Sequence, residues 1–180
     1  MANKVWLYSP GENARKWEDC LVSRIMCIGW DDLGDLSMYG SREDIRDKLV
    51  ELYGPGNKYT NDSLATWQFA NEIQVGDIIF VKKDRNSIIC MGTVQSIYKF
   101  DKTRGEYKNT IDVDWTDYGE WPTEDYAPTK TLTEITKYAD YVKRLTALVQ
   151  QNEFVQETCN YWWLCANPKV WSMSEWAVGD

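Results

Sequence analysis

The sequence contains no histidine. This absence excludes Ser–His and Cys–His nucleophile pairs, histidine acid–base catalysis and the usual histidine-containing zinc sites. A phosphate-binding P-loop is also missing, because Gly54-Pro55-Gly56 lacks the following Lys-Ser/Thr pair. No spacing singles out two carboxylates for glycoside hydrolysis. We therefore expect this chain to have no catalytic residues, no bound metal and no cofactor.

Cysteines and long apolar runs are scarce as well. The 180 residues include five cysteines, an odd number without a Cys-x-x-Cys pair, which favours reduced thiols in a cytoplasmic protein. No apolar run reaches the ~20 residues of a membrane-spanning helix, and the first residues lack the pattern of a signal peptide. With 43% hydrophobic and 27% charged residues, the composition is that of a globular domain. The sequence predicts a cytoplasmic localisation and no membrane partner.

Basic residues are outnumbered, since 20 Lys and Arg face 28 Asp and Glu and give a net charge of −8. A protein that coats nucleic acid through charge alone would be basic. A pocket that reads a single nucleotide beside a local basic strip is compatible with this charge. The charge therefore narrows the mode of nucleic-acid binding without excluding it.

Aromatic residues are abundant by contrast. The 10 Trp and 11 Tyr exceed the needs of a core of this size, and each Trp must also place its N–H group. Taken singly, each Trp is more typical of a core, but three of them lie at strand ends or in segments that lead into strands, where pockets form on small barrels. As a set they predict a cage around a planar base: Trp30, Trp67 and Trp115.

The hydrophobic pattern predicts an α+β fold, a small twisted mixed β-barrel of about six largely antiparallel strands flanked by helices. A capping box at residues 41–44 begins one helix, and Gly54 ends it. Gly92 is expected to form a bulge or a bend inside a strand, and residues 118–128 are expected to be irregular. The expected strands are residues 4–8, 24–30, 77–83, 87–100 and 108–115, and the expected helices are residues 13–22, 41–53, 61–72 and 133–150.

Residues 1–153 are expected to form this domain. Trp163-Leu164 followed by Pro168 echoes Trp6-Leu7 followed by Pro10, and Val-Gly-Asp at residues 178–180 echoes residues 75–77. We interpret residues 154–180 as a linker and the start of a second, related unit. The alternative is a C-terminal strand that returns to the first sheet.

Two clusters of charged residues are candidate binding sites, one for a divalent cation and one for phosphates. Acidic residues follow the second strand, where a divalent cation is one interpretation and the capping of turns is the more usual one: Asp31, Asp32 and Asp35. Basic residues gather in one hairpin and in the loop after the next strand, where they would contact phosphates without reading sequence. An ordinary solvated hairpin explains them equally well. These predicted phosphate-binding residues are Lys82, Lys83, Arg85, Lys99, Lys102 and Arg104.

Four stretches resemble the EVE-like domains of the PUA superfamily, in particular the N-terminal modules of McrB-type AAA+ restriction proteins. They are Val-Trp-Leu-Tyr-Ser-Pro at residues 5–10, Ile-Gly-Trp-Asp-Asp-Leu-Gly-Asp-Leu at residues 28–36, Trp-Gln-Phe-Ala-Asn at residues 67–71 and Val-Gly-Asp at residues 75–77. The stretch Trp-Asp-Asp-Leu-Gly-Asp is the most specific of them. The resemblance covers residues 1 to about 150.

The resemblance implies a PUA-like barrel, related to the YTH readers of methylated adenine, that accepts a flipped base in an aromatic pocket. It assigns Trp30 to the cage, Trp115 to the support of the pocket and Ser9 to the edge of the bound base. The third cage wall stays open among Tyr98, Tyr118 and Trp121. The pocket segment is Trp67, Gln68 and Asn71, although this chain lacks the arginine of that segment.

The expected function is therefore recognition of modified, methylated double-stranded DNA, as the specificity domain of a McrB-type restriction system in phage defence. The AAA+ motor and the nuclease would lie outside this chain. An RNA-binding PUA- or YTH-like module is the alternative. Burying one methyl group contributes only ~0.8 kcal/mol, so discrimination also requires hydrogen bonds to the edge of the base.

Overall fold

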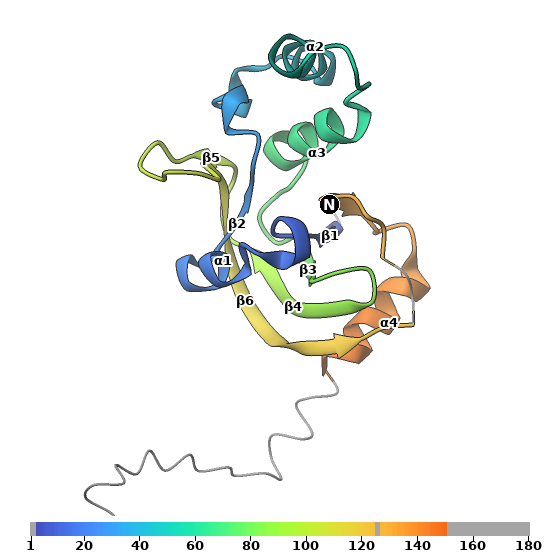
Figure 1. Ribbon diagram of the computed structural model, residues 1–180. Helices are drawn as coiled ribbons and strands as arrows, with labels where there is room; N and C mark the ends of the chain where they lie inside the picture. Colours follow the sequence, from blue (N-terminus) through green and yellow to red (C-terminus); the bar gives the residue numbers. More distant parts are fainter. Residues whose placement is uncertain (1–2, 125–126, 151–180) are drawn as a thin grey trace, which may run out of the picture. The chain divides into compact units, whose positions relative to one another are not determined.

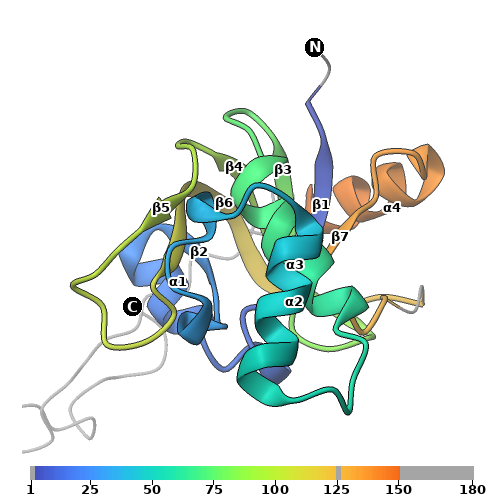
Figure 2. The same ribbon diagram turned by 90° about the horizontal axis from the view of Figure 1, so that it is seen from above.

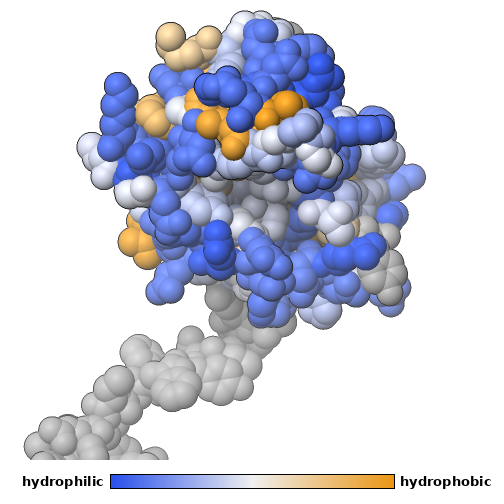
Figure 3. Space-filling model, turned by 45° about the horizontal axis from the view of Figure 1, so that its top comes forward, coloured by the Kyte–Doolittle hydropathy of each residue, from blue (hydrophilic) through white to orange (hydrophobic). Residues whose placement is uncertain are grey.

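The computed structural model describes residues 3–124 and 127–150 (Figure 1). The expected second unit at residues 154–180, and its boundary near residue 153, lie outside these residues. No helix within the described part of the chain is long and apolar enough to cross a membrane. The face of the molecule drawn in Figure 3 is mostly hydrophilic, with hydrophobic side chains in small separate groups.

In the described residues, seven strands form one mixed sheet in the order β2-β6-β4-β3-β1-β7, with β5 paired to β6. Strands β1 and β3 pair in parallel, whereas the other described pairings are antiparallel. The sheet curls into a half-barrel, which confirms the predicted α+β fold with a small twisted sheet (Figure 1). The strands are β1 (Val5–Tyr8), β2 (Ile25–Ile28), β3 (Ile78–Lys82), β4 (Ser87–Val94), β5 (Lys99–Phe100), β6 (Asn109–Pro122) and β7 (Leu132–Glu134).

Helices flank the sheet, as Figures 1 and 2 show: α2 and α3 lie side by side, and α4 packs against β4 and β6. The predicted start and end of this helix are confirmed, because the Ser41 side chain accepts a hydrogen bond from the Asp44 N–H group at 3.2 Å and Gly54 follows α2 with φ 84°. The helices are α1 (Trp17–Ser23), α2 (Arg42–Tyr53), α3 (Thr60–Asn71) and α4 (Ala139–Gln150), and the 3-10 turns are η1 (Glu12–Ala14), η2 (Asp31–Leu33) and η3 (Leu36–Met38).

Three expectations about the strands were wrong. Residues 87–100 form two strands, β4 and β5, and β6 continues through residues 118–122, which were expected to be irregular. Part of the predicted helix at residues 133–150 is instead strand β7, which pairs with β1 in the register Leu7↔Thr133. A three-residue strand has almost no local signal, because the hydrogen bonds of a distant partner define it.

The alternation of side chains along β1 divides the core into two layers. Trp6 and Tyr8 face the concave side, where they pack with residues of β2, α3 and β6. Leu7 and Phe80 face the convex side, where they pack beneath α4 with Leu145. Successive residues of a strand point to opposite faces, so one short strand serves both layers.

The Tyr8 hydroxyl connects β1 to β2, two strands that are not neighbours in the sheet. It donates a hydrogen bond to the Cys27 carbonyl oxygen at 2.5 Å and accepts one from the Cys27 N–H group at 3.0 Å. Burial raises the pKa of this fully buried phenol, so it keeps the proton that it donates. One side chain therefore supplies the hydrogen bonds that a neighbouring strand would otherwise give to Cys27.

Tyr8→Phe should destabilise the fold by about 1–3 kcal/mol, because both backbone groups of Cys27 lose their buried partner. Thermal melting should show this as a fall in Tm of roughly 2–4 °C per kcal/mol. Tyr118→Phe is the matched control, since Tyr118 is 65% exposed. Equal melting temperatures for the two variants would contradict this role of Tyr8.

Gly92→Ala should also lower Tm. The register of β4 against β6 shifts between Met91 and Gly92, and the extra residue, Thr116, lies in β6 opposite Gly92, so the expected bulge at Gly92 is found in the partner strand instead. An added Cβ would lie 2.4 Å from the Trp115 ring and 2.7 Å from the Asp114 carbonyl oxygen. Overpacking of this kind costs about 1–3 kcal/mol.

Gly56→Ala provides the comparison for Gly92, because a Cβ there would meet no atom within 4 Å. If the two variants melted alike, the close packing around Gly92 would not be a constraint on the fold.

Candidate functional site

A cleft of about 400 Å³ opens where the chain leaves β1 and β2. Its volume lies in the ~300–1,000 Å³ range of small-molecule sites. We name it the Trp30 cleft, and its lining residues are Ser9, Gly11, Glu12, Cys27, Ile28, Gly29, Trp30, Tyr107, Thr129 and Thr131. Two of the sequence-predicted site residues, Ser9 and Trp30, meet here.

Trp30 forms one aromatic wall of the cleft. It has a left-handed backbone conformation, with φ 62° and ψ 39°, and its carbonyl oxygen accepts a hydrogen bond from the Leu33 N–H group at 2.9 Å. The ring is half-buried and packs against the concave core. A left-handed conformation is costly for a bulky residue and persists where the surroundings fix it, often beside a ligand site.

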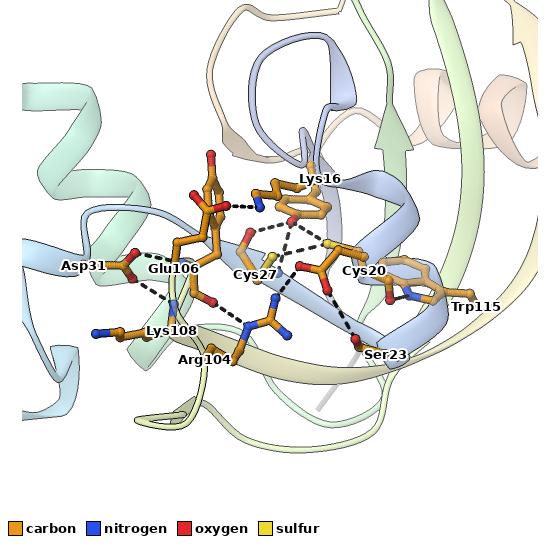
Figure 4. A network of polar contacts seen from close by, with 12 residues as sticks. Lys16, Cys20, Ser23, Cys27, Asp31, Arg104, Glu106, Lys108 and Trp115 are labelled. Atoms are coloured by element: carbon orange, nitrogen blue, oxygen red, sulfur yellow. Dashed lines mark hydrogen bonds and ion pairs between the residues drawn. The ribbon is translucent and has the colours of Figure 1, made fainter.

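Tyr107, in the loop between β5 and β6, provides a second aromatic wall that the sequence did not reveal. The Asp31 carboxylate accepts hydrogen bonds from the N–H groups of Tyr107 and Lys108 at 2.7 and 2.8 Å (Figure 4). The Arg15 guanidinium donates to the Tyr107 hydroxyl at 3.1 Å. Because Asp31 follows Trp30 directly, one short turn positions both rings.

Two of the three acidic residues in this turn, Asp31 and Asp35, cap backbone groups, as the more usual interpretation expects. Besides Asp31, Asp32 accepts a hydrogen bond from the Tyr53 hydroxyl at 2.9 Å, and Asp35 accepts one from the Ser37 N–H group at 3.0 Å. Among the residues that the structure describes, no group of three or more His, Cys, Asp or Glu is placed to hold a metal ion.

The polar rim of the cleft lies beyond β1. The Ser9 hydroxyl donates to the Gly11 carbonyl oxygen at 3.0 Å, and its oxygen can still accept a hydrogen bond. The carboxylate-bearing Glu12 is exposed. Asn13 and Ala14 follow with φ 51° and 55°, a second left-handed segment at the edge of the cleft. The rim thus combines hydrogen-bonding groups with a fixed, strained main chain.

The structure does not bring the aromatic residues of β6 to the Trp30 cleft. Trp115 is 8% exposed, and its indole N–H donates to the Cys20 carbonyl oxygen at 3.2 Å. Trp121 is buried in the convex layer, whereas Tyr118 is 65% exposed. The expectation that these three residues share a pocket with Trp30 was wrong, because the twist and alternation of β6 direct them to separate places.

The helix α3 and Tyr98 also lie away from this cleft. Trp67 is half-buried against the concave core, and the Asn71 amide donates to the Trp67 carbonyl oxygen at 3.1 Å. Gln68 lines a different cleft. The Tyr98 hydroxyl donates to Asn109 Oδ1 at 2.7 Å and accepts from the Leu36 N–H group at 2.9 Å, so it has an internal role.

The predicted phosphate strip does not line the Trp30 cleft either. Three of its cations are paired with carboxylates, in the pairs Lys83–Glu120, Lys99–Asp112 and Arg104–Asp19. Arg85 and Lys102 are exposed on their loops. These cations are therefore dispersed, and half of them lie beside an anion that would compete with a phosphate.

Lys82, the sixth of these cations, is only 4% exposed and supports the wall of the cleft instead. Its ammonium group donates to the Pro128 carbonyl oxygen. Further along, the Ser9 N–H group donates to the Thr131 carbonyl oxygen at 2.9 Å. These bonds fix the segment that carries Thr129 and Thr131. Burial, together with the charge of nearby Arg85, lowers the pKa of Lys82 to about 8.

One family model, described as a domain of unknown function (DUF8426), matches residues 6–139. A search of curated proteins finds no match. The matched range contains β1, β2, the acidic turn and the loop with Tyr107, and so every lining residue of the Trp30 cleft.

Lys82 should make the stability of the protein rise with pH above about pH 8. Its pKa is about 8 in the folded state against an ordinary 10.5, so the folded protein loses this proton first. Between these values the unfolded chain binds more protons, and the free energy of unfolding increases. Below both values Lys82 adds no pH dependence. Lys82→Met should therefore flatten the rise seen in urea unfolding of the wild type.

Lys83→Met is the control, because its ammonium group is exposed and paired with Glu120. This variant should retain the rise in the free energy of unfolding between about pH 8 and pH 10. If the free energy of unfolding of Lys82→Met rose with pH in parallel with that of the wild type, Lys82 would not be buried as a charged group.

Proposed function

The chain belongs to the DUF8426 family, and we propose that it is a recognition module that accepts a modified, methylated DNA base in the Trp30 cleft. The observation that carries this proposal is the pair of rings, Trp30 and Tyr107, that line one cleft and are positioned by Asp31. Two aromatic walls suit a flat, uncharged ligand, and a nucleobase is such a ligand.

The energetics of base flipping support this function. Extraction of a base from a duplex costs a few kcal/mol of unpairing and unstacking. Stacking on an aromatic side chain returns ~1–3 kcal/mol per base. Because Trp30 and Tyr107 are held before a ligand arrives, little further ordering of these rings is required on binding.

Polar groups at the rim supply the specificity. Ser9 and the threonines at residues 129 and 131 can donate or accept at the edge of a base, whereas the Glu12 carboxylate can only accept. A carboxylate accepts hydrogen bonds from the exocyclic amino group of cytosine in protein–DNA complexes. A methylated cytosine is therefore the base that we expect to bind best.

The charge distribution indicates that a single module binds DNA weakly. The net charge of −8 opposes general attraction to DNA. At the Trp30 cleft, Arg15 is exposed, and its hydrogen-bond partner is the Tyr107 hydroxyl. We propose that affinity is raised by multivalency, in a McrB-type restriction protein whose AAA+ motor presents several such modules. Motor and nuclease activities belong to that larger assembly, and this chain has no catalytic role.

Trp30→Ala should abolish the preference for a modified base. The panel consists of duplexes and single strands with cytosine or adenine, each plain or methylated, and the readout is the ratio of Kd values. Because the ring is half-buried, the free energy of unfolding should fall by less than the ~3–5 kcal/mol that removal of a fully buried Trp costs. The fall in Tm should be correspondingly smaller. Trp6→Ala, which removes a fully buried ring, gives the reference for that larger loss.

Two outcomes would contradict the proposal. One is a wild-type protein that binds methylated and plain bases alike, and the other is a Trp30→Ala variant that keeps the wild-type preference. Stronger binding to modified RNA than to every DNA probe would favour the RNA-binding alternative.

A further inference from the structure

A second cleft, of about 360 Å³, lies between α3 and β7. Gln68 and Leu64 line it from α3, and Glu134 lines it from β7. Its polar lining also includes Thr133, Tyr138 and two lysines, Lys130 and Lys137. We name it the Lys130 cleft. Gln68, which the sequence placed in a base pocket, belongs to this cleft instead.

The two clefts share a wall. Thr129 and Thr131 line the Trp30 cleft, whereas Lys130 and Leu132 line the Lys130 cleft. Residues 129–131 form a bend that leads into β7, and Thr133 and Glu134 of β7 also line the Lys130 cleft. One short segment therefore carries residues of both clefts, so the two clefts adjoin along it.

The cations of the Lys130 cleft differ from the predicted phosphate strip. Within the described residues, neither Lys130 nor Lys137 has a carboxylate partner, and the Lys137 ammonium lies 5.0 Å from the centre of the Tyr138 ring. The carboxylate of the cleft, Glu134, is instead paired with Lys4 at 3.3 Å. The two lysines thus leave positive charge available in an otherwise acidic protein.

We propose that the Lys130 cleft binds the backbone phosphate next to the base that occupies the Trp30 cleft, which rests on the proposed function. Lysine binds phosphate as a flexible point charge, and such contacts fix the position of a nucleic acid without reading its sequence. The Gln68 amide donates one hydrogen bond to the Glu72 carboxylate at 3.5 Å, and its second N–H can donate to a phosphate oxygen. The ligand is then a nucleotide unit bound on both sides of one segment.

The test is the double variant Lys130→Gln, Lys137→Gln, with methylated and plain duplexes of one sequence as probes. We expect Kd to rise about tenfold for both duplexes, since each lost charged hydrogen bond is substantial. The slope of log K against log salt should become shallower by about 0.9, the value for the loss of one phosphate contact. The ratio between the two Kd values should stay as in the wild type.

Lys58→Gln, Lys143→Gln is the control, because both lysines are exposed and neither lines either cleft. The inference is overturned if the Lys130 and Lys137 variant matches this control in affinity and salt slope. It is also overturned if the variant changes the ratio of the two Kd values, because phosphate contacts do not distinguish bases.

Trp30→Ala, measured beside these variants, separates the two hypotheses. A loss of preference in Trp30→Ala together with unchanged affinity in the lysine variant would overturn the phosphate site alone. Unchanged preference in Trp30→Ala would overturn the base site, whatever the lysine variant shows.

Discussion

The Tyr8 hydroxyl is the contact on which the rest of this fold depends. Strands β1 and β2 share no backbone pairing, yet the chain needs them close together, because the Trp30 cleft is built from the residues that follow each strand. Tyr8 satisfies both polar backbone groups of Cys27 from inside the core. Strand β1 is already paired with β3 and β7 in the described residues, so the Tyr8 side chain joins β2 to it across the core without a backbone ladder.

The acidic turn after β2 positions two aromatic walls of the Trp30 cleft. The motif at residues 30–35 places a ring in a left-handed conformation and, one residue later, a carboxylate that holds the opposite loop. Trp30 and Tyr107 are 77 positions apart in the sequence, and Asp31 brings them to the same cleft. One short motif thus contains both a ring of the Trp30 cleft and the carboxylate that holds the opposite loop.

Local chemistry made part of this structure predictable. The N-cap of α2 at Ser41 and the end of that helix at Gly54 each follow from residues that are adjacent in the sequence. The position of Trp30 at a strand end also placed it correctly in a cleft. Tyr107, Lys82 and β7 could not be predicted in the same way, because each is defined by a contact far along the chain. Lys82 shows the reason most clearly: a lysine in a hairpin is normally solvated, and only the packing of residues 127–131 reveals that it is buried.

The segment between Pro128 and Leu132 has a mechanical consequence. It is anchored by Lys82 at one end and by Ser9 near the other, and it contributes residues to both clefts. Because the anchors hold this segment in place, the widths of the two clefts are set together. A substitution that loosened either anchor would therefore alter both clefts at once.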